Sequence, residues 1–150
     1  MSLRLTSYTD YALRVLIFLA AKGNDELSSI REISEVYGIS KNHLMKIIYG
    51  LGKMGIIKTI RGRNGGIRLA KEPKDINIGA VVRQTEEDFR IVECFDSDHN
   101  VCVISPVCTL RHILHEALAA YLHVLDQYTL ADLVADPKSY RIHFMKQSET

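Results

Sequence analysis

Residues 29–53, SIREISEVYGISKNHLMKIIYGLGK, contain two short helix patterns joined by a single tight turn. Ser29 opens a Ser-x-x-Glu capping box, which predicts a helix that begins there and stops at Gly38. Ser40 can cap a second helix over 41–53, in which apolar residues recur at helical spacing. A helix, a glycine turn and a helix in this order are typical of a helix-turn-helix.

A β-hairpin is predicted directly after the second helix. Two short β-type runs, at 56–60 and 66–69, flank the sequence RGRNGG at 61–66. Asn64-Gly65 is a favoured hairpin turn, because both residues tolerate a positive φ. A helix-turn-helix followed by a hairpin predicts a winged helix, and the fold class is therefore mainly α with a small β-hairpin.

The charge of the chain is distributed unevenly. Residues 38–71 include eight basic residues and no Asp or Glu, whereas residues 86–98 include six acidic residues and one arginine. The net charge of +1 hides this division. The basic residues of 38–71 could simply form a solvated surface. Because they coincide with the predicted helix-turn-helix and hairpin, they instead favour double-stranded DNA as the partner.

We expect the DNA contacts to come from the first half of the second helix and from the hairpin tip. Such a helix presents its N-terminal residues to base edges in the major groove, and wing arginines suit the minor groove of A·T-rich DNA. Asn42 can pair with adenine, whereas Ser40 is better suited to capping the helix. The expected DNA-binding residues are Ser40, Lys41, Asn42, His43, Lys46, Arg61, Arg63 and Asn64.

Four further helices are predicted, over 8–22, over 78–85, over 130–135 and from Pro106 to about Tyr128. The last is long and carries apolar residues at alternating spacings of four and three, which is a heptad seam. This seam either packs against the protein's own core or forms a symmetric dimer interface, which a winged helix that reads palindromic DNA needs. The seam residues are Leu110, Leu114, Ala117, Tyr121, Val124 and Tyr128.

The predicted elements divide the chain into three segments. Residues 1–75 form the winged helix-turn-helix DNA-binding domain, and residues 76–108 form a connecting helix and a cysteine-bearing loop. Residues 109–150 form a dimerisation helix, a short helix and a polar tail. Because no secretory signal or membrane-spanning run is visible, we expect a cytoplasmic protein that does not associate with a membrane.

All three cysteines lie within fifteen residues, as Cys94-x7-Cys102-x5-Cys108. Structural zinc sites normally contain closely spaced cysteine pairs, which are absent here, although His99 or His112 could supply a fourth zinc ligand. A disulfide switch would leave one thiol without a partner. An iron–sulfur cluster suits widely spaced thiolates on a loop better, and its connection to a DNA-binding module indicates sensing. No cofactor motif or nucleophile–base pair indicates an enzyme.

The chain resembles a known group of regulators in several stretches. These are LTSYTDYALR at 5–14, ISKNHL at 39–44 and RGRNGG at 61–66, together with the three late cysteines. They are similar to the NsrR-like nitric-oxide-sensing repressors, which belong to the winged-helix family that also contains IscR. The resemblance extends to about residue 136.

This resemblance implies a homodimeric repressor that binds one [4Fe–4S] cluster per subunit. It also implies that the repressor dissociates from the operator when nitric oxide attacks the cluster. It also implies the ligands of that cluster. Three are Cys94, Cys102 and Cys108, and the fourth is an aspartate of the first helix, supplied by the other subunit. Asp10 matches that position. Without the resemblance, Asp10 is explained as a first-turn acid favoured by the helix dipole.

An IscR-like regulator with a [2Fe–2S] cluster is an alternative within the same family. Resemblance to that group implies a histidine ligand three residues after the last cysteine. This sequence has Arg111 there and His112 one position later, which on a helix is a rotation of about 100°. The departure weakens the IscR-like alternative. A winged-helix regulator with a structural zinc site is the other alternative.

Overall fold

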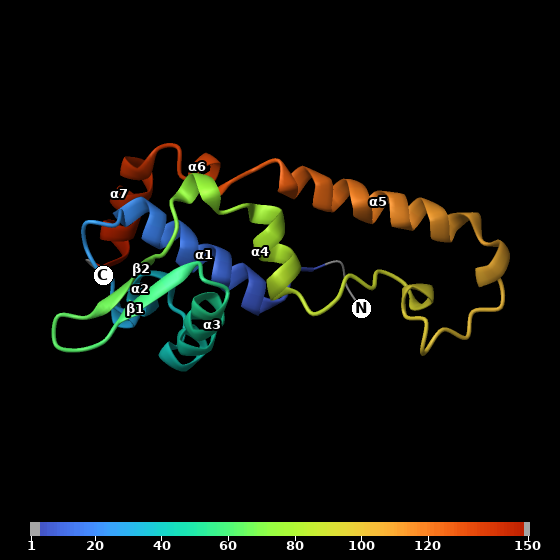
Figure 1. Ribbon diagram of the computed structural model, residues 1–150, viewed down its shortest axis with the longest axis horizontal. Coiled ribbons are helices and arrows are strands. Elements are labelled where there is room, and N and C mark those ends of the chain that lie inside the picture. The colour runs from blue at the N-terminus through green and yellow to red at the C-terminus, as the bar shows by residue number, and fades with distance from the viewer. Residues whose placement is uncertain (1–3, 149–150) are drawn as a thin grey trace.

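The computed structural model describes residues 4–148 as an elongated molecule (Figure 1). Most elements gather at one end, whereas one long helix extends away from them and carries the cysteine-bearing loop (residues 86–108) at its far end. The fold class predicted from the sequence, mainly α with a small hairpin, is confirmed. The elements are α1 (Ser7–Lys22), α2 (Ile30–Tyr37), α3 (Lys41–Lys53), β1 (Ile57–Ile60), β2 (Gly66–Leu69), α4 (Ile78–Thr85), α5 (Thr109–Asp126), α6 (Leu130–Leu133) and α7 (Pro137–Ser148).

The helix-turn-helix has the predicted boundaries. Ser29 caps α2 by accepting a hydrogen bond from the Glu32 N–H at 3.1 Å, and Gly38 ends it in the left-handed conformation with φ of 69°. Ser40 caps α3 in the same way, at 3.2 Å. The second half of the predicted capping box is not formed, because the Glu32 carboxylate pairs with Lys22 at 2.7 Å.

The wing is the antiparallel hairpin β1–β2 with its connecting turn. The positive φ expected at Asn64 and Gly65 is wrong: no described residue other than glycine has a positive φ, and in the wing Gly62 and Gly66 adopt it instead. Gly65 has a different role. A Cβ atom there would lie 2.1 Å from the backbone oxygen of Ile60, so the turn closes only around glycine.

The hydrophobic core lies among α1, α2, α3, α4 and α6. Leu16, Ile33, Leu44, Ile47 and Leu130 are fully buried in it. Each such side chain contributes roughly 1.5–3 kcal/mol relative to an exposed one. The helix-turn-helix is therefore held on a rigid base formed by α1.

A polar joint connects α5 to α4. Arg83 of α4 binds the Asp126 carboxylate through two hydrogen bonds, and the Asn77 amide donates to the Asp126 backbone oxygen at 2.7 Å. The hydrogen bond from Arg83 lowers the pKa of Asp126. Gly79 allows this close approach, because a Cβ atom there would lie 1.9 Å from the Asp126 Oδ1. The joint fixes the C-terminal end of α5 to the winged helix.

The long helix is a few residues shorter than predicted at both ends. Pro106 lies in a 3-10 turn, Ser105–Val107, and α5 begins only at Thr109. The helix ends at Asp126, before Tyr128. The chain there leaves the helical path to pair with the segment before α4 through a β-bridge and a hydrogen bond from the Ile78 N–H to the Tyr128 oxygen at 2.9 Å.

The helix α7 was not predicted; it ends within the polar tail expected over 147–150, and it packs on α1 and α2. The Phe144 ring packs against both Phe18 and Tyr37, with ring centroids 5.0 and 5.7 Å away. Residues 149–150, the end of that tail, lie outside the described residues. The helices α6 and α7 thus contact the winged helix even though they follow α5 in the sequence, and the threefold division of the chain stays a prediction.

Candidate functional site

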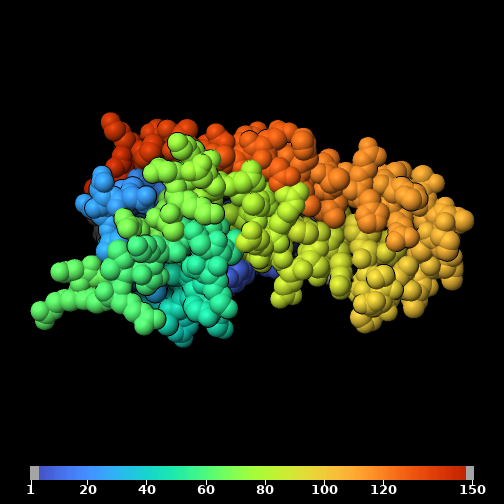
Figure 2. All heavy atoms as spheres, in the orientation of Figure 1, coloured from blue at the N-terminus to red at the C-terminus, as the bar shows by residue number. Residues whose placement is uncertain are grey.

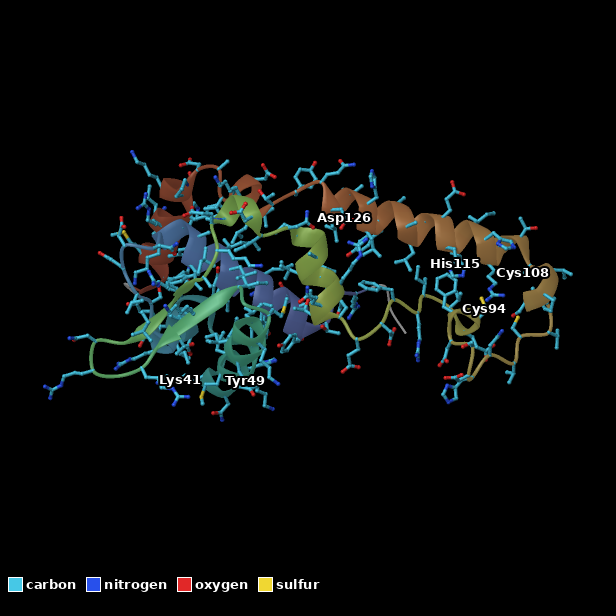
Figure 3. All side chains as sticks on the ribbon, in the orientation of Figure 1. Lys41, Tyr49, Cys94, Cys108, His115 and Asp126 are labelled. Atoms are coloured by element: carbon cyan, nitrogen blue, oxygen red, sulfur yellow. The ribbon has the colours of Figure 1, made fainter. Side chains whose placement is uncertain are left out.

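The helix α3 and the wing project from the same side of the molecule, away from α6 and α7 (Figure 1). Figure 3 labels Lys41 and Tyr49 on this projecting edge. Six of the eight residues expected to bind DNA have exposed side chains here and form no hydrogen bond or ion pair with another described side chain: Lys41, Asn42, Lys46, Arg61, Arg63 and Asn64. This basic edge has the shape of a helix flanked by a protruding hairpin.

The other two expected DNA-binding residues have partners within the fold. Ser40 is the N-cap of α3, as the sequence suggested. His43 is half-buried, and its ring meets Tyr11 of α1 edge-on with centroids 5.1 Å apart. A role for either residue in DNA recognition stays a prediction.

Two large exposed side chains on α3 were missed by the sequence analysis. Met45 is 55% exposed and Tyr49 is 67% exposed. The ammonium of Lys53 lies 5.1 Å from the Tyr49 ring. The signal was the regular spacing of four residues from Lys41 to Met45, Tyr49 and Lys53, which places all of them along one face of the helix. They extend the basic edge with apolar surface.

The three cysteines lie on the loop between α4 and α5. Cys94 is in a 3-10 turn, Glu93–Phe95, and Cys108 immediately precedes α5. Cys94 and Cys108 are half-buried, Cys102 is exposed, and all three are free thiols. Figure 3 shows Cys94 and Cys108 at the same end of α5, far from the basic edge.

Two local hydrogen-bond networks hold this loop. The Asp96 carboxylate binds Arg90 at 3.0 Å and His99 at 2.9 Å, and the hydrogen bond with His99 lowers the pKa of Asp96. The Asn100 side chain accepts from the Cys102 N–H at 3.1 Å and donates to Ser105 at 2.9 Å. Both networks lie within residues 90–105 and use no thiol, so they shape the loop without occupying the thiols.

The start of the loop is tied to the start of α1. The Glu86 carboxylate accepts from the N–H of Thr6 at 2.9 Å and from its hydroxyl at 2.7 Å. Beneath this contact, the hydroxyls of Thr9 and Thr85 form a buried hydrogen bond of 2.9 Å. A cleft of about 420 Å³ lies beside it and extends to Tyr121 of α5.

Asp10 lies apart from the cysteines of its own chain. It is in the first turn of α1, a helix that lies with the winged helix in Figure 1, whereas Cys94 and Cys108 lie at the far end of α5 (Figure 3). Its carboxylate binds Arg14 through two hydrogen bonds of 3.0 and 3.1 Å, and both side chains are nearly half exposed. An exposed carboxylate of this kind is accessible to another chain.

The cysteine-bearing loop has the chemistry of a soft metal site. Among residues 4–148, no three His, Cys, Asp or Glu side chains are already gathered at metal-binding spacing. The loop nevertheless offers three thiols, none of them in a disulfide, on a segment with little regular structure. Thiolates on an adaptable loop fit an iron–sulfur cluster, whose binding orders such a segment.

The long helix α5 leaves one face uncovered. None of its residues is fully buried, and Leu110, Ile113, Tyr121, Val124 and the following Tyr128 are 37–58% exposed. In Figure 2 the α5 region extends from the rest of the molecule with the cysteine-bearing loop beside it. The other predicted seam residues divide: Leu114 is half-buried against its own chain, whereas Ala117 is exposed. An apolar stripe of this length is typical of a surface that another subunit covers.

No helix within the described part of the chain has the length and hydrophobicity that a membrane span requires.

Sequence comparisons identify relatives over most of the chain. The model of the family Rrf2, described as an iron-dependent transcriptional regulator, matches residues 5–136. The HTH-type transcriptional regulator NsrR of Bacillus subtilis (strain 168) is 68% identical over 132 residues, which cover 88% of this chain and 90% of that protein. NsrR of Bacillus licheniformis is 60% identical over 139 residues, with coverage of 93% and 97%.

Solved structures share the fold. A putative transcriptional regulator from Listeria innocua has a TM-score of 0.76 at 29% identity, covering 91% of this chain and 89% of that one. IscR of T. potens has a TM-score of 0.71 at 27% identity, with coverage of 89% and 88%. The predicted resemblance to NsrR-like regulators and the prediction of a transcriptional regulator, not an enzyme, are confirmed by these matches. The chain with the basic helix-turn-helix edge and the three-cysteine loop belongs to the Rrf2 family of iron-dependent, DNA-binding transcriptional regulators.

Proposed function

We propose that this protein is a homodimeric repressor whose binding to a palindromic, A·T-rich operator is controlled by a nitric-oxide-sensitive [4Fe–4S] cluster. Cys94, Cys102 and Cys108 would hold the cluster, with Asp10 of the partner subunit as the fourth ligand. The observation that carries the proposal is the loop of three free thiols that runs directly into the exposed helix α5. Relatives named NsrR that match nearly the whole chain support it.

The basic edge supports operator binding. Lys41, Asn42 and Lys46 would enter the major groove on α3, and Arg61 and Arg63 would reach the adjacent minor groove. Met45 and Tyr49 extend the helical part of this surface: Met45 offers apolar contact for thymine methyl groups, and the Tyr49 hydroxyl can donate to a phosphate. Two such edges in a symmetric dimer would read the two halves of a palindrome.

The thiolates supply the ligands and α5 supplies the connection to DNA. When bound, the cluster supplies iron centres that react with nitric oxide. Loss of thiolate ligation would free the loop, whose last cysteine is the residue that precedes α5. The other end of α5 is fixed to α4 by Arg83 and Asp126, so a shift of α5 would move the winged helix. A switch of tenfold to a hundredfold in DNA affinity requires only about 1.4–2.8 kcal/mol of differential binding.

Anaerobic purification tests the proposal. We expect a brown protein with about four irons and as many sulfides per chain, whose visible absorbance bleaches on addition of nitric oxide together with its operator binding. A protein in which Cys102 is replaced by Ser is the matched comparison, because that thiol is exposed and its loss disturbs no packing. A colourless protein with one zinc per chain would overturn the proposal.

The IscR-like alternative has one observation in its favour, the structural similarity to IscR of T. potens. In the structure, Arg111 occupies the position three residues after Cys108 and is half-buried, whereas His112 is exposed. The histidine that the [2Fe–2S] site requires is therefore absent from position 111. About two irons per chain in the same analysis would favour this alternative.

A further inference from the structure

A stack of two aromatic rings joins the cysteine-bearing loop to α5. The ring of Phe95 lies on the imidazole of His115, with centroids 3.9 Å apart and an angle of 11° between the planes. Phe95 is half-buried and follows Cys94 directly in the 3-10 turn. His115 projects from α5 close to the cysteine end of the molecule (Figure 3).

The position of His115 on α5 relates the stack to the last cysteine. His115 is seven residues after Cys108, which is nearly two full turns of an α-helix. Cys108 is the N-cap residue of α5, so it lies about 10 Å before His115 along the helix axis. Because Phe95 is bonded to Cys94, the stack brings the turn that contains the first cysteine to the end of α5 at which the last cysteine lies.

Within residues 4–148, the stack is the one ring contact between the loop and α5. Among the described residues, no hydrogen bond or ion pair joins the segment between α4 and Cys108 to α5. The two networks around Asp96 and Asn100 connect loop residues only with one another. Phe89 and Ile91 of the loop line the same cleft as Leu118 and Tyr121 of α5, so apolar surface also meets there, near the start of the loop. Close to Cys94, the ring contact is the directional contact between the loop and α5.

We propose that the Phe95–His115 stack is a positioning contact, which holds Cys94 in register with Cys108 before metal is bound. The inference rests on the proposed role of the cysteines as cluster ligands. A loop whose first and last ligands are already aligned loses less conformational freedom when it closes around a cluster, so the cluster is bound more tightly and released more slowly. His115 acts here through its ring face, and its nitrogens are not required.

The first test uses the metal-free chain. We expect the side-chain protons of His115 to resonate upfield of those of His123, an exposed histidine of the same helix that has no ring partner among the described residues, because the Phe95 ring shields them. Replacing Phe95→Leu should abolish this difference. Equal shifts for the two histidines in the parent chain would show that the stack does not form, and the proposal would be rejected whatever the metal content.

The second test measures the rate at which the reconstituted protein loses iron to a chelator under anaerobic conditions. We expect Phe95→Leu and His115→Ala to accelerate the loss about two- to tenfold, the factor that corresponds to one aromatic pair. His115→Phe should restore the parent rate, since phenylalanine stacks but cannot bind metal. His123→Ala is the matched control and should leave the rate unchanged.

The outcomes separate this inference from the proposed function. Unchanged iron loss in both Phe95→Leu and His115→Ala would refute the positioning role while the cluster itself remained. Failure of His115→Phe to rescue, combined with no effect of Phe95→Leu, would instead make His115 a ligand and overturn the proposal. A parent protein that binds zinc and no iron would reject both, although the spectrum of the metal-free chain would still report whether the stack exists.

Discussion

Asp10 is a partly exposed side chain whose interactions within its own chain are weak. Within its own chain the carboxylate has a simple partner, Arg14, one helical turn away. Surface ion pairs of this kind contribute at most about 1 kcal/mol, so the carboxylate can leave Arg14 at small cost. This makes Asp10 available as an oxygen ligand for a partner subunit, and an oxygen ligand would hold its iron more weakly than a thiolate does.

Replacing Asp10→Ala should therefore leave a folded protein that retains its cluster through three thiolates. We expect the visible absorbance and circular dichroism spectra of the cluster to change, together with the rate of its reaction with nitric oxide. Glu35→Ala is the matched control, because Glu35 is the acid of a similar exposed pair with Arg31 on α2. Spectra and rates identical to those of the parent would show that Asp10 is not a cluster ligand and only stabilises the start of α1.

The hairpin of the wing determines where its arginines lie relative to α3. Its tip extends beyond the rest of the molecule on the side of α3, and Arg63 at the tip is exposed. An exposed arginine elsewhere on the molecule would be too far from a duplex bound to α3. The hairpin instead extends Arg63 toward the groove next to the one that α3 would occupy. The turn is narrow because Gly65 admits the backbone of Ile60.

We expect Arg63→Ala to weaken operator binding and to lower the slope of log affinity against log salt by about one ion, since one cation is removed from the DNA interface. Binding measured at several salt concentrations gives this slope. Arg141→Ala, which removes an exposed arginine of α7, should leave it unchanged. If the slope is the same in Arg63→Ala and the parent, the wing is not part of the DNA interface.

At the scale of the whole molecule, the length of α5 separates the cysteine-bearing loop from the basic edge. A single chain leaves the apolar stripe of α5 in solvent and keeps Asp10 away from the cysteines. A symmetric dimer along α5 would cover the stripe and give each loop access to the other chain. The two features that are incomplete in one subunit would then be completed by the same association.

Ile113 and Ile142 test this arrangement directly. Both are isoleucines that are 53% exposed, the first on the α5 stripe and the second on α7. Ile113→Lys should weaken dimerisation about a hundredfold, because an unpaired ammonium would be buried at the interface. Ile142→Lys should not weaken it, and sedimentation equilibrium measures both. A dimer of parent stability in Ile113→Lys would remove α5 from the interface.

Much of the fold could be predicted from local sequence signals. The caps Ser29, Ser40 and Asn77 mark helix starts because their side chains accept hydrogen bonds from the first turn of the helix, a contact within one segment. The residues of the basic edge were equally visible as a run of like charge. The cysteine trio was visible because all three thiols lie on one loop. Local chemistry of this kind needs no knowledge of the rest of the molecule.

Tertiary contacts decided the remainder. The helix α7 was missed because its residues become apolar partners only when Phe144 meets Phe18 and Tyr37, from elements more than a hundred residues earlier. The glycines of the wing were misassigned because positive φ depends on how the two strands meet. The stack of Phe95 on His115 joins residues twenty positions apart, and no periodicity links them. Apart from α7, the sequence by itself determined which segments become helix, hairpin and cysteine-bearing loop, because those preferences are local. Only the tertiary structure decided which faces stay uncovered and which rings meet, because these depend on distances between segments that the order of residues does not specify.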